Sequence, residues 1–156
     1  MFSLIACIGK NRELGNQGQL VFHLKDDMKF FRDTTTNHSV VMGRKTWDSL
    51  PAKLKDRQNL VITRHDFSGP DAIIHDPEEF ITKHQDTSEE IFIIGGASIY
   101  SMFLPYAHNL YLTEVDASAD ADVYFPEFDK TKYSQTLIKK GKDHDLAYSI
   151  IKYAKN

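Results

Sequence analysis

The sequence predicts an α/β fold, with helices on both faces of a mostly parallel sheet, in one domain that spans residues 1–156. Short apolar runs that end near glycine alternate with segments of helical periodicity, which is typical of β-α-β units. The last two strand-like segments instead alternate polar and apolar residues, as an antiparallel edge does. The predicted order is β-α-β-α-β-β-α-β-α-β-β-β, without repeats or linkers.

Six short apolar segments are predicted to be buried strands, at residues 2–8, 39–42, 59–63, 72–75, 91–94 and 109–115. Residues 91–94 are the most apolar of them, so we expect this strand at the centre of the sheet. Two later strands, around residues 133–139 and 146–153, should form the antiparallel edge. Residues 9–19 hold few large apolar side chains and are expected to form a mobile loop.

Four segments have the spacing or the end signals of helices, at residues 24–35, 44–50, 77–84 and 97–104. The second and fourth stop before Pro51 and Pro105, because proline cannot continue a helix. The third begins with Pro77 and two acidic residues, which suit the first turn of a helix.

The composition is that of an ordinary globular protein, with 41% hydrophobic and 26% charged residues. We expect no membrane segment, because no apolar run approaches the roughly 20 residues of a span, and we expect no signal peptide. The single cysteine excludes an internal disulfide and fits a reducing cytoplasm. Scattered histidines indicate no metal site. Nothing in the sequence demands an oligomer, so a monomer is expected.

Charge is distributed unevenly along the chain. Residues 44–64 contain six basic and two acidic side chains, a local excess of four positive charges, whereas residues 114–129 are acidic. The net charge of −3 argues against general nucleic-acid binding. A basic segment in an acidic chain suits a small polyanionic ligand; the alternative is an uneven solvated surface.

Asp27 lies in the apolar stripe of the first helix, which Leu24, Met28 and Phe31 define. Its neighbour Asp26 can pair with Lys29 three residues on, but Asp27 has no such partner nearby. A carboxylate among apolar side chains is costly unless something bonds it, so the partner can be a ligand. The alternative is a structural carboxylate in water or on a remote backbone amide, and the helix alone slightly favours it. Thr113, within an apolar strand, is a candidate partner.

Two buried strands each deliver their end to glycine and then to a helix N-terminus, at Gly43 and at Gly95-Gly96. Free N–H groups and the helix dipole favour anions at such ends, and ligands of open α/β sheets gather there. A dinucleotide is therefore a candidate ligand. Arg44 and Lys45 would be free to meet an additional phosphate, which favours NADP over NAD. A single glycine, taken alone, is more often only a turn.

Three other residues have weaker assignments. Arg57 can present a two-pronged donor to a carboxylate, although a plain surface arginine is the commoner case. Cys7 has no basic neighbour in the sequence, which argues against a nucleophile. Trp47 and Tyr100 are expected in the core or in the walls of a ligand cleft.

Taken together, these segments resemble those of bacterial-type dihydrofolate reductases, in family order and spacing along the whole chain. The matching residues are Ser3-Leu4-Ile5-Ala6, Leu14-Gly15, Asp27-x-x-x-Phe31-x-x-x-Thr35, Val41-Met42-Gly43-Arg44-Lys45-Thr46, Arg57-x-Asn59, Ile93-Ile94-Gly95-Gly96-x-x-x-Tyr100, Leu110-Tyr111-Leu112-Thr113 and Asp122-x-x-x-Phe125-Pro126. The resemblance implies an eight-stranded sheet with four helices, and NADPH-dependent reduction of 7,8-dihydrofolate to tetrahydrofolate. It also implies that antifolates bind.

The resemblance also implies roles for individual residues. Asp27, supported by Thr113, would bind the pterin, with Phe22 beside them at the catalytic centre. The substrate would lie against Ile5, Met28, Phe31, Leu50, Leu54, Ile94 and Tyr100, with Arg57 on the glutamate carboxylate. The cofactor would contact Ala6, Cys7, Leu14, Gly15, Gly18, Gln19, Gly43, Arg44, Lys45, Thr46, Thr63, Arg64, Gly95, Gly96, Ala97, Ser98, Ile99 and Tyr100. Asp122 would tie its loop to residues 15–22.

Two departures from the family pattern stand out. Val21-Phe22 replaces the usual Pro-Trp before the helix, and phenylalanine lacks the indole donor that normally bonds an ordered water near the acid. Residues 52–55 replace a run that contains proline in many relatives.

Two alternative functions remain open at this point. One is a pyrimidine reductase of riboflavin synthesis, which shares the fold; the other is a non-catalytic NADP-binding module. Neither needs a carboxylate at Asp27, so the acid in the apolar stripe discriminates against both.

Overall fold

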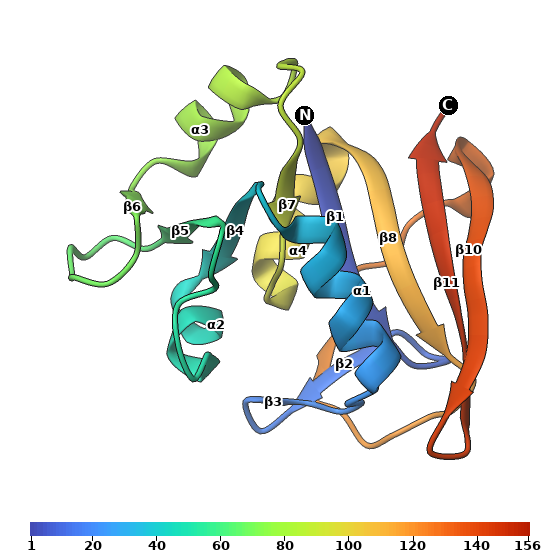
Figure 1. Ribbon diagram of the computed structural model, residues 1–156. Coiled ribbons are helices and arrows are strands. Elements are labelled where there is room, and N and C mark those ends of the chain that lie inside the picture. Colours follow the sequence, from blue (N-terminus) through green and yellow to red (C-terminus); the bar gives the residue numbers. More distant parts are fainter.

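Parallel strands form the centre of the molecule, and a long antiparallel hairpin closes one edge (Figure 1). The computed structural model describes all residues, 1–156. The main sheet has eight strands in the order β10-β11-β8-β1-β7-β4-β5-β6. Their bounds are β1 Phe2–Ile8, β4 Ser39–Gly43, β5 Gln58–Ile62, β6 Ala72–Ile74, β7 Ile91–Ile93, β8 Ala107–Val115, β10 Tyr133–Asp143 and β11 Leu146–Lys155.

The pairing confirms the predicted sheet. β1 pairs in parallel with β7 on one side and with β8 on the other. β11 runs antiparallel to both β8 and β10, which makes the C-terminal hairpin the antiparallel edge. All three residues of β7 are buried and β7 lies beside β1 in the middle of the sheet, so the most apolar strand is central as predicted.

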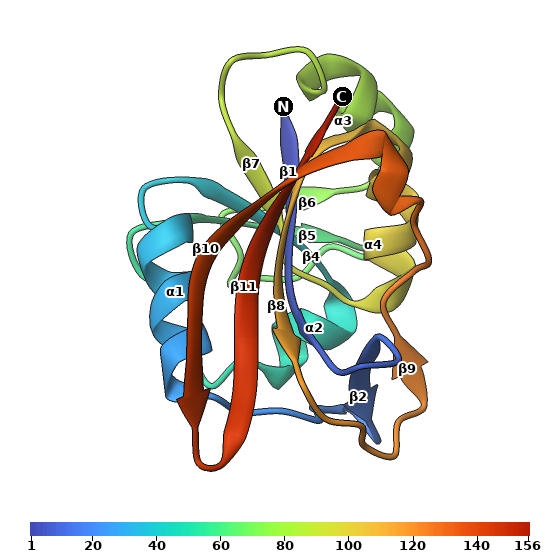
Figure 2. The ribbon, with the colours of Figure 1, turned by 90° about the vertical axis from the view of Figure 1, so that its right-hand side faces the viewer.

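Four helices cover the two faces of the sheet: α1 Lys25–Thr35, α2 Arg44–Ser49, α3 Pro77–His84 and α4 Ala97–Phe103. Figure 2 shows α1 on one side of the sheet and α3 and α4 on the other. The side chains agree, because Phe31 of α1 and Trp47 of α2 pack with Ile5 of β1, whereas Phe103 of α4 packs with Leu4. Short 3₁₀ turns at Leu104–Tyr106 and Lys130–Lys132 complete the set, and no helix is long and apolar enough to span a membrane.

The alternation of side chains along β1 explains this two-sided core. Leu4 and Ile5 are neighbours in sequence and are 0% and 4% exposed, yet they belong to clusters on opposite faces. Burying one such side chain contributes about 1.5–3 kcal/mol. A strand buried on both faces is therefore apolar at nearly every position, which is the pattern that the sequence shows.

The segment after β1 differs from the irregular loop that the sequence predicts. β2 Glu13–Asn16 pairs with β3 Gln19–Leu20 and with β9 Val123–Tyr124 in a second, three-stranded sheet. Its strands have only two to four residues each, too few to show a period, so the prediction of a loop was wrong here.

A buried acid organises the start of that sheet. Glu13 is 2% exposed and accepts backbone N–H groups of Asn11 at 2.6 Å and Ala119 at 2.8 Å. Burial alone would raise the pKa of this carboxyl, but the N–H donors outweigh it and hold the pKa below its ordinary value. Glu13 therefore fixes β2 to the loop that follows β8.

Asp122 joins the same two segments further along. Its backbone N–H donates to the Gly15 carbonyl at 3.0 Å, and its carboxylate accepts the Gln17 N–H at 3.0 Å. This contact between the Asp122 loop and residues 15–22 is the one that the family resemblance implies. Phe22 follows at the end of the segment and is 9% exposed, packed with Cys7 and Leu24.

Candidate active site

Asp27 projects from the first turn of α1 toward the sheet, where it finds a partner. Thr113 of β8 is 1% exposed and donates its hydroxyl to Asp27 Oδ1 at 2.6 Å. Cys7 of β1 lies directly opposite Thr113 in the parallel register. Burial raises the pKa of Asp27, while the Thr113 donor partly opposes that rise. The proposed Asp27–Thr113 contact is thus present in the structure.

The neighbouring acid has a different partner from the one predicted. Lys29 pairs with Asp33 at 2.8 Å rather than with Asp26. Asp26 is half-buried and accepts a hydrogen bond from the hydroxyl of Tyr148, on β11. The spacing of residues along one helix cannot reveal a partner that is 122 positions away.

The predicted apolar walls of the site come together, with one exception. Ile5 is buried, and Phe31, Leu50, Leu54 and Ile94 pack against the same cluster. Met28 is 61% exposed, so its predicted place in the buried stripe was wrong. The side of α1 that faces the sheet runs through Leu24, Asp27, Phe31 and Thr35, and Met28 lies about 100° to the side of Asp27 around the helix axis.

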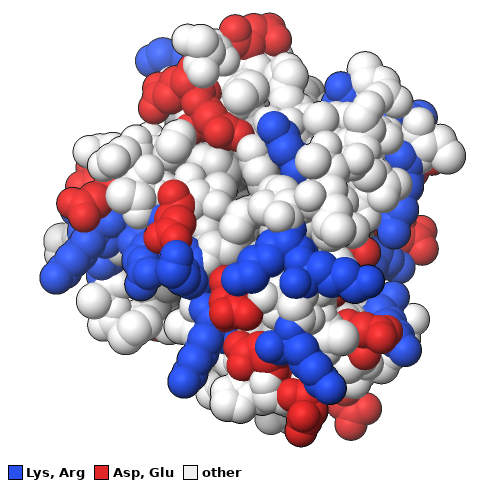
Figure 3. Space-filling model, turned by 45° about the vertical axis from the view of Figure 1, so that its right-hand side comes forward, with Lys and Arg blue, Asp and Glu red and all other residues white.

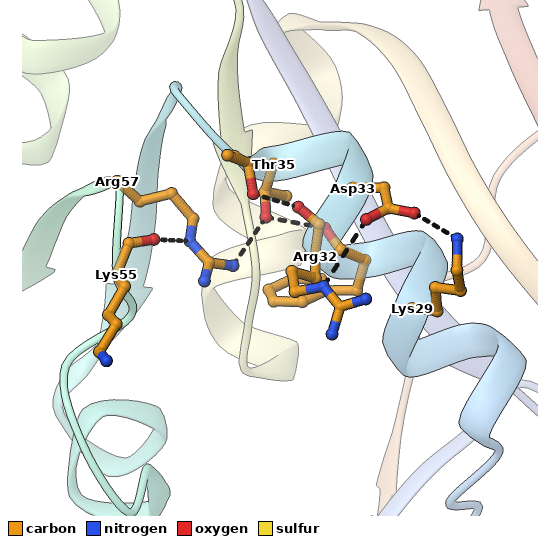
Figure 4. A network of polar contacts seen from close by, with 8 residues as sticks. Lys29, Arg32, Asp33, Thr35, Lys55 and Arg57 are labelled. Atoms are coloured by element: carbon orange, nitrogen blue, oxygen red, sulfur yellow. Dashed lines mark hydrogen bonds and ion pairs between the residues drawn. The ribbon is translucent and has the colours of Figure 1, made fainter.

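Arg57 is held with part of its guanidinium unengaged (Figure 4). Nε donates to the Lys55 carbonyl at 2.8 Å, and Nη1 donates to the Thr35 hydroxyl at 3.1 Å. The group lies 5.9 Å from the centre of the Phe31 ring, and partial burial lowers its pKa. No acidic side chain pairs with it, so the fork is fixed in direction while Nη2 has no protein partner.

The two glycine-ended strands meet side by side. The Gly43 N–H donates to the Gly95 carbonyl at 2.9 Å, which brings the starts of α2 and α4 together. Neither helix has a side-chain cap, whereas Asp76 caps α3. Gly95 has φ +128, and a Cβ there would lie 3.5 Å from the Thr46 hydroxyl. The starts of α2 and α4 therefore lie close together, and no side chain caps the backbone N–H groups of either helix.

The residues predicted to contact the cofactor differ in their exposure to solvent. Tyr100 is 4% exposed and donates its hydroxyl to the Ile5 carbonyl at 2.7 Å, and Ile99 is also buried. Ala97 and Thr63 are partly exposed, and Ser98 is exposed. On the loop side, Leu14 and Gly15 are buried and Ala6 is partly buried, while Gly18 and Gln19 are exposed.

The basic residues near the glycines are less free than the sequence indicates. Arg44 pairs with Asp48 at 3.0 Å and its guanidinium carbon lies 3.7 Å from the centre of the Phe67 ring, so its predicted freedom was wrong. Lys45 and Arg64 are exposed and have no acidic partner. Figure 3 shows Lys and Arg side chains in a band across one face of the molecule, with acidic side chains gathered below it.

Asp27 lines neither of two hollows in the protein surface. A groove of about 970 Å³ lies over β8 and β11 and is lined by charges of both signs, among them Lys10, Glu114 and Lys130. A hollow of about 700 Å³ is lined by Lys53, Leu54, Lys55 and Arg57. The second therefore lies beside the residue predicted to hold the carboxylate end of a substrate.

The fold is that of an α/β protein, and the candidate site includes residues that follow the carboxyl ends of its parallel strands β4 and β7. The sequence model of the family described as dihydrofolate reductase matches residues 1–155. The chain therefore belongs to the dihydrofolate reductase family and is an oxidoreductase of that family.

Several proteins that are similar to this chain are named dihydrofolate reductase. The chain is 39% identical to dihydrofolate reductase of Buchnera aphidicola subsp. Acyrthosiphon pisum, with 88% of this chain and 86% of the relative covered. It is 34% identical to the Bacillus subtilis enzyme, with 95% and 89% covered. It is 35% identical to the Neisseria gonorrhoeae enzyme, with 97% and 96% covered.

Proposed function

We propose that this protein reduces 7,8-dihydrofolate to 5,6,7,8-tetrahydrofolate with NADPH and so supplies one-carbon metabolism. The cofactor, when bound, supplies a hydride from nicotinamide C4 to pterin C6, and N5 of the pterin takes a proton. Family membership supports the substrate. The observation that supports the chemistry most directly is the partly buried pair of Asp27 and Thr113.

Asp27 is proposed to bind the amino-pyrimidine edge of the pterin. A carboxylate accepts two donors side by side, and this edge presents an amino group and a ring N–H. Thr113 already bonds Oδ1, which orients the carboxyl group before substrate arrives. The raised pKa brings Asp27 closer to neutral pH, where an acid both holds and passes a proton efficiently.

Phe22 is proposed to shield this acid rather than to bond a water. Its ring is buried with Cys7 and Leu24, next to the start of α1. It lacks the donor of the tryptophan that the family usually has at this position. Ile5, Phe31, Leu50, Leu54, Ile94 and Tyr100 are proposed to form the walls around the substrate, with the exposed Met28 at their outer edge. Arg57 is proposed to hold the tail carboxylate of the substrate through the unengaged part of its guanidinium.

Three observations support a dinucleotide phosphate site at the ends of the two strands that lead into Gly43 and Gly95. The starts of α2 and α4 lack side-chain caps, a Cβ on Gly95 would fill space that faces Thr46, and Lys45 and Arg64 have no acidic partner. We propose that Gly43, Arg44, Lys45, Thr46, Thr63 and Arg64 hold the cofactor phosphates, and that Gly95, Gly96, Ala97, Ser98, Ile99 and Tyr100 line the pyrophosphate and nicotinamide side. Ala6, Cys7, Leu14, Gly15, Gly18 and Gln19 would complete the nicotinamide site.

Near-ultraviolet absorbance of NADPH, followed with and without dihydrofolate, tests the proposal. We expect NADPH oxidation that requires dihydrofolate and is blocked by an antifolate. Oxidation only with a ribosylaminopyrimidine, or cofactor binding without turnover, would overturn it. The same samples, run on a sizing column, test the proposed monomer, and fractionation of the source cells tests the proposed cytoplasmic location.

A further inference from the structure

Two contacts tie the first turn of α1 to the C-terminal hairpin, and the proposed mechanism uses neither. The backbone N–H of Lys25 donates to Asp143 Oδ2 at 2.6 Å, and the Tyr148 hydroxyl donates to Asp26 Oδ2. Asp143 ends β10 and Tyr148 lies on β11. Figure 2 shows the turn of this hairpin at the same end of the molecule as the start of α1.

Asp143 supplies a cap that the sequence of α1 does not provide. The residue before the helix is Leu24, whose side chain has no hydrogen-bonding group, and it makes no cap. The Asp143 side chain is 12% exposed and places a negative charge at the helix N-terminus, where the dipole favours it. The start of α1 is therefore fixed by a residue 118 positions away in the sequence.

Tyr148 reaches Asp26 through a space that the hairpin leaves open. It is 2% exposed and lies opposite Gly141 of β10, where a Cβ would come within 2.6 Å of the tyrosine oxygen. Burial and the Asp26 carboxylate raise the pKa of Tyr148 to about 12, so the hydroxyl keeps its proton and donates.

These contacts restrict how Asp27 can move. Successive residues of a helix point about 100° apart around its axis. Tyr148 holds Asp26, and Thr113 holds Asp27, so together they fix the rotation of the first turn. Asp143 accepts the backbone N–H of Lys25 and so fixes the position of the first turn of α1 along the helix axis. All three partners belong to the connected strands β8, β11 and β10.

We infer that Asp143 and Tyr148 are positioning residues for Asp27, which set where its carboxylate meets the substrate without touching the substrate themselves. The inference rests on the proposed function, because Asp27 is taken as the acid that binds the pterin. It predicts that the C-terminal hairpin affects turnover of dihydrofolate and leaves cofactor binding unchanged.

Tyr153 provides a matched control for Tyr148. It lies on the same strand, is 0% exposed and donates to a carboxylate, Glu114, but makes no contact with α1. Tyr148→Phe and Tyr153→Phe each remove one buried tyrosine–carboxylate bond. The experiment measures kcat and KM for dihydrofolate, the Kd of NADPH, and the thermal midpoint of the wild type and both variants.

We expect Tyr148→Phe to lower kcat/KM for dihydrofolate about 3- to 10-fold, since small displacements of a reacting group are costly, with the Kd of NADPH unchanged. Tyr153→Phe should lower the thermal midpoint comparably and leave kcat/KM at the wild-type value. Asp143→Ala should lower kcat/KM about 2- to 5-fold, and Asp143→Asn should recover most of this, because the amide oxygen still accepts the Lys25 N–H.

An unchanged kcat/KM in both Tyr148→Phe and Asp143→Ala would overturn the inference, and so would equal losses in Tyr148→Phe and Tyr153→Phe. If Tyr148→Phe does not fold, the Asp143 pair decides alone, and equal losses in Asp143→Ala and Asp143→Asn would then contradict it. Absence of dihydrofolate turnover in the wild type would overturn the proposed function instead, so the two failures are distinguishable.

Discussion

The acid half of the site and its glycine half are built from different parts of the chain. Around Asp27 the contact is between side chains, with the Thr113 hydroxyl as donor, in a partly buried setting. Around Gly43 and Gly95 the contacts are between backbone groups, and the helix starts carry no side-chain caps. Turnover should therefore be sensitive to the loss of a single polar atom in the acid half. Cofactor binding should be sensitive to the gain of a single carbon atom in the glycine half.

The largest expected effect is that of Asp27→Asn. It should lower kcat about 10²- to 10⁴-fold at neutral pH, because the acid is lost, while NADPH binding persists. The pKa of Asp27 is raised by folding, so its contribution to stability is present at low pH and is lost as the pH rises through the folded-state pKa. Asp27→Asn should accordingly melt at the same or a higher temperature than the wild type at pH 7. Turnover near the wild-type rate would remove Asp27 from the mechanism.

Gly95→Ala probes the glycine half. The substitution forces φ +128 on a residue with a Cβ, and that Cβ would face Thr46 and Tyr100 at 3.5 Å. We expect a loss of about 1–3 kcal/mol in unfolding free energy and a Kd of NADPH about 10- to 100-fold higher. Gly69→Ala is the control, since Gly69 has φ +129 and faces Trp47. It should lose stability similarly but bind NADPH normally; equal binding by both variants would refute the phosphate site.

Thr113→Val tests whether one hydroxyl matters to the acid half. Removing the donor to Asp27 should lower kcat/KM for dihydrofolate about 2- to 12-fold, which corresponds to the loss of one typical hydrogen bond of about 0.5–1.5 kcal/mol. Because that donor lowers the pKa of Asp27, its loss should shift the pH profile of kcat/KM toward higher pH. Thr136→Val, at an exposed position of β10, should change neither quantity. A pH profile that stays in place would show that the bond is unimportant.

Glu13→Gln should have the smallest effect on activity. It extends the comparison of the two halves to a carboxylate that is held by backbone N–H groups rather than by side chains. The pKa of Glu13 is lower in the folded state than in the unfolded state, so the carboxylate contributes to folding stability at pH values above the unfolded-state pKa. This contribution is lost as the pH falls through the folded-state pKa. The variant should lose about 1–3 kcal/mol at pH 7 and less in acid. Urea unfolding at both pH values measures this, with the exposed Glu127→Gln as control. A loss independent of pH would contradict the account.

Much of the fold was predictable because apolar periodicity reports burial directly. The strand at β7 and the helix at Pro77–His84 were placed from their composition and end signals. β2, β3 and β9 were missed, because strands of two to four residues are too short to show a period. Glu13 was missed because its partners are backbone groups that no residue type reveals.

The candidate site was predictable as a set of residues rather than as a set of contacts. Thr113 was found as a partner for Asp27 because a polar residue in an apolar strand needs one. The partner of Asp26 was predicted incorrectly, because Tyr148 is brought close only by the tertiary structure. The pairing of Arg44 with Asp48 was overlooked, although the two residues lie four positions apart on one helix and the spacing alone could have indicated it. The exposure of Met28 shows the limit of a helical stripe, whose edges depend on what the helix packs against.

The central position of β1 has a consequence for how the chain reaches its native state. Its partners lie at residues 91–93 and 107–114, so the middle of the sheet closes only when segments far apart in the sequence have come together. Contacts of such long sequence separation slow folding, because the loop entropy is lost before the pairing compensates it. In synthesis from the N-terminus, β1 and Asp27 therefore precede the partners that complete their environment, and Asp27 precedes Thr113 by 86 residues.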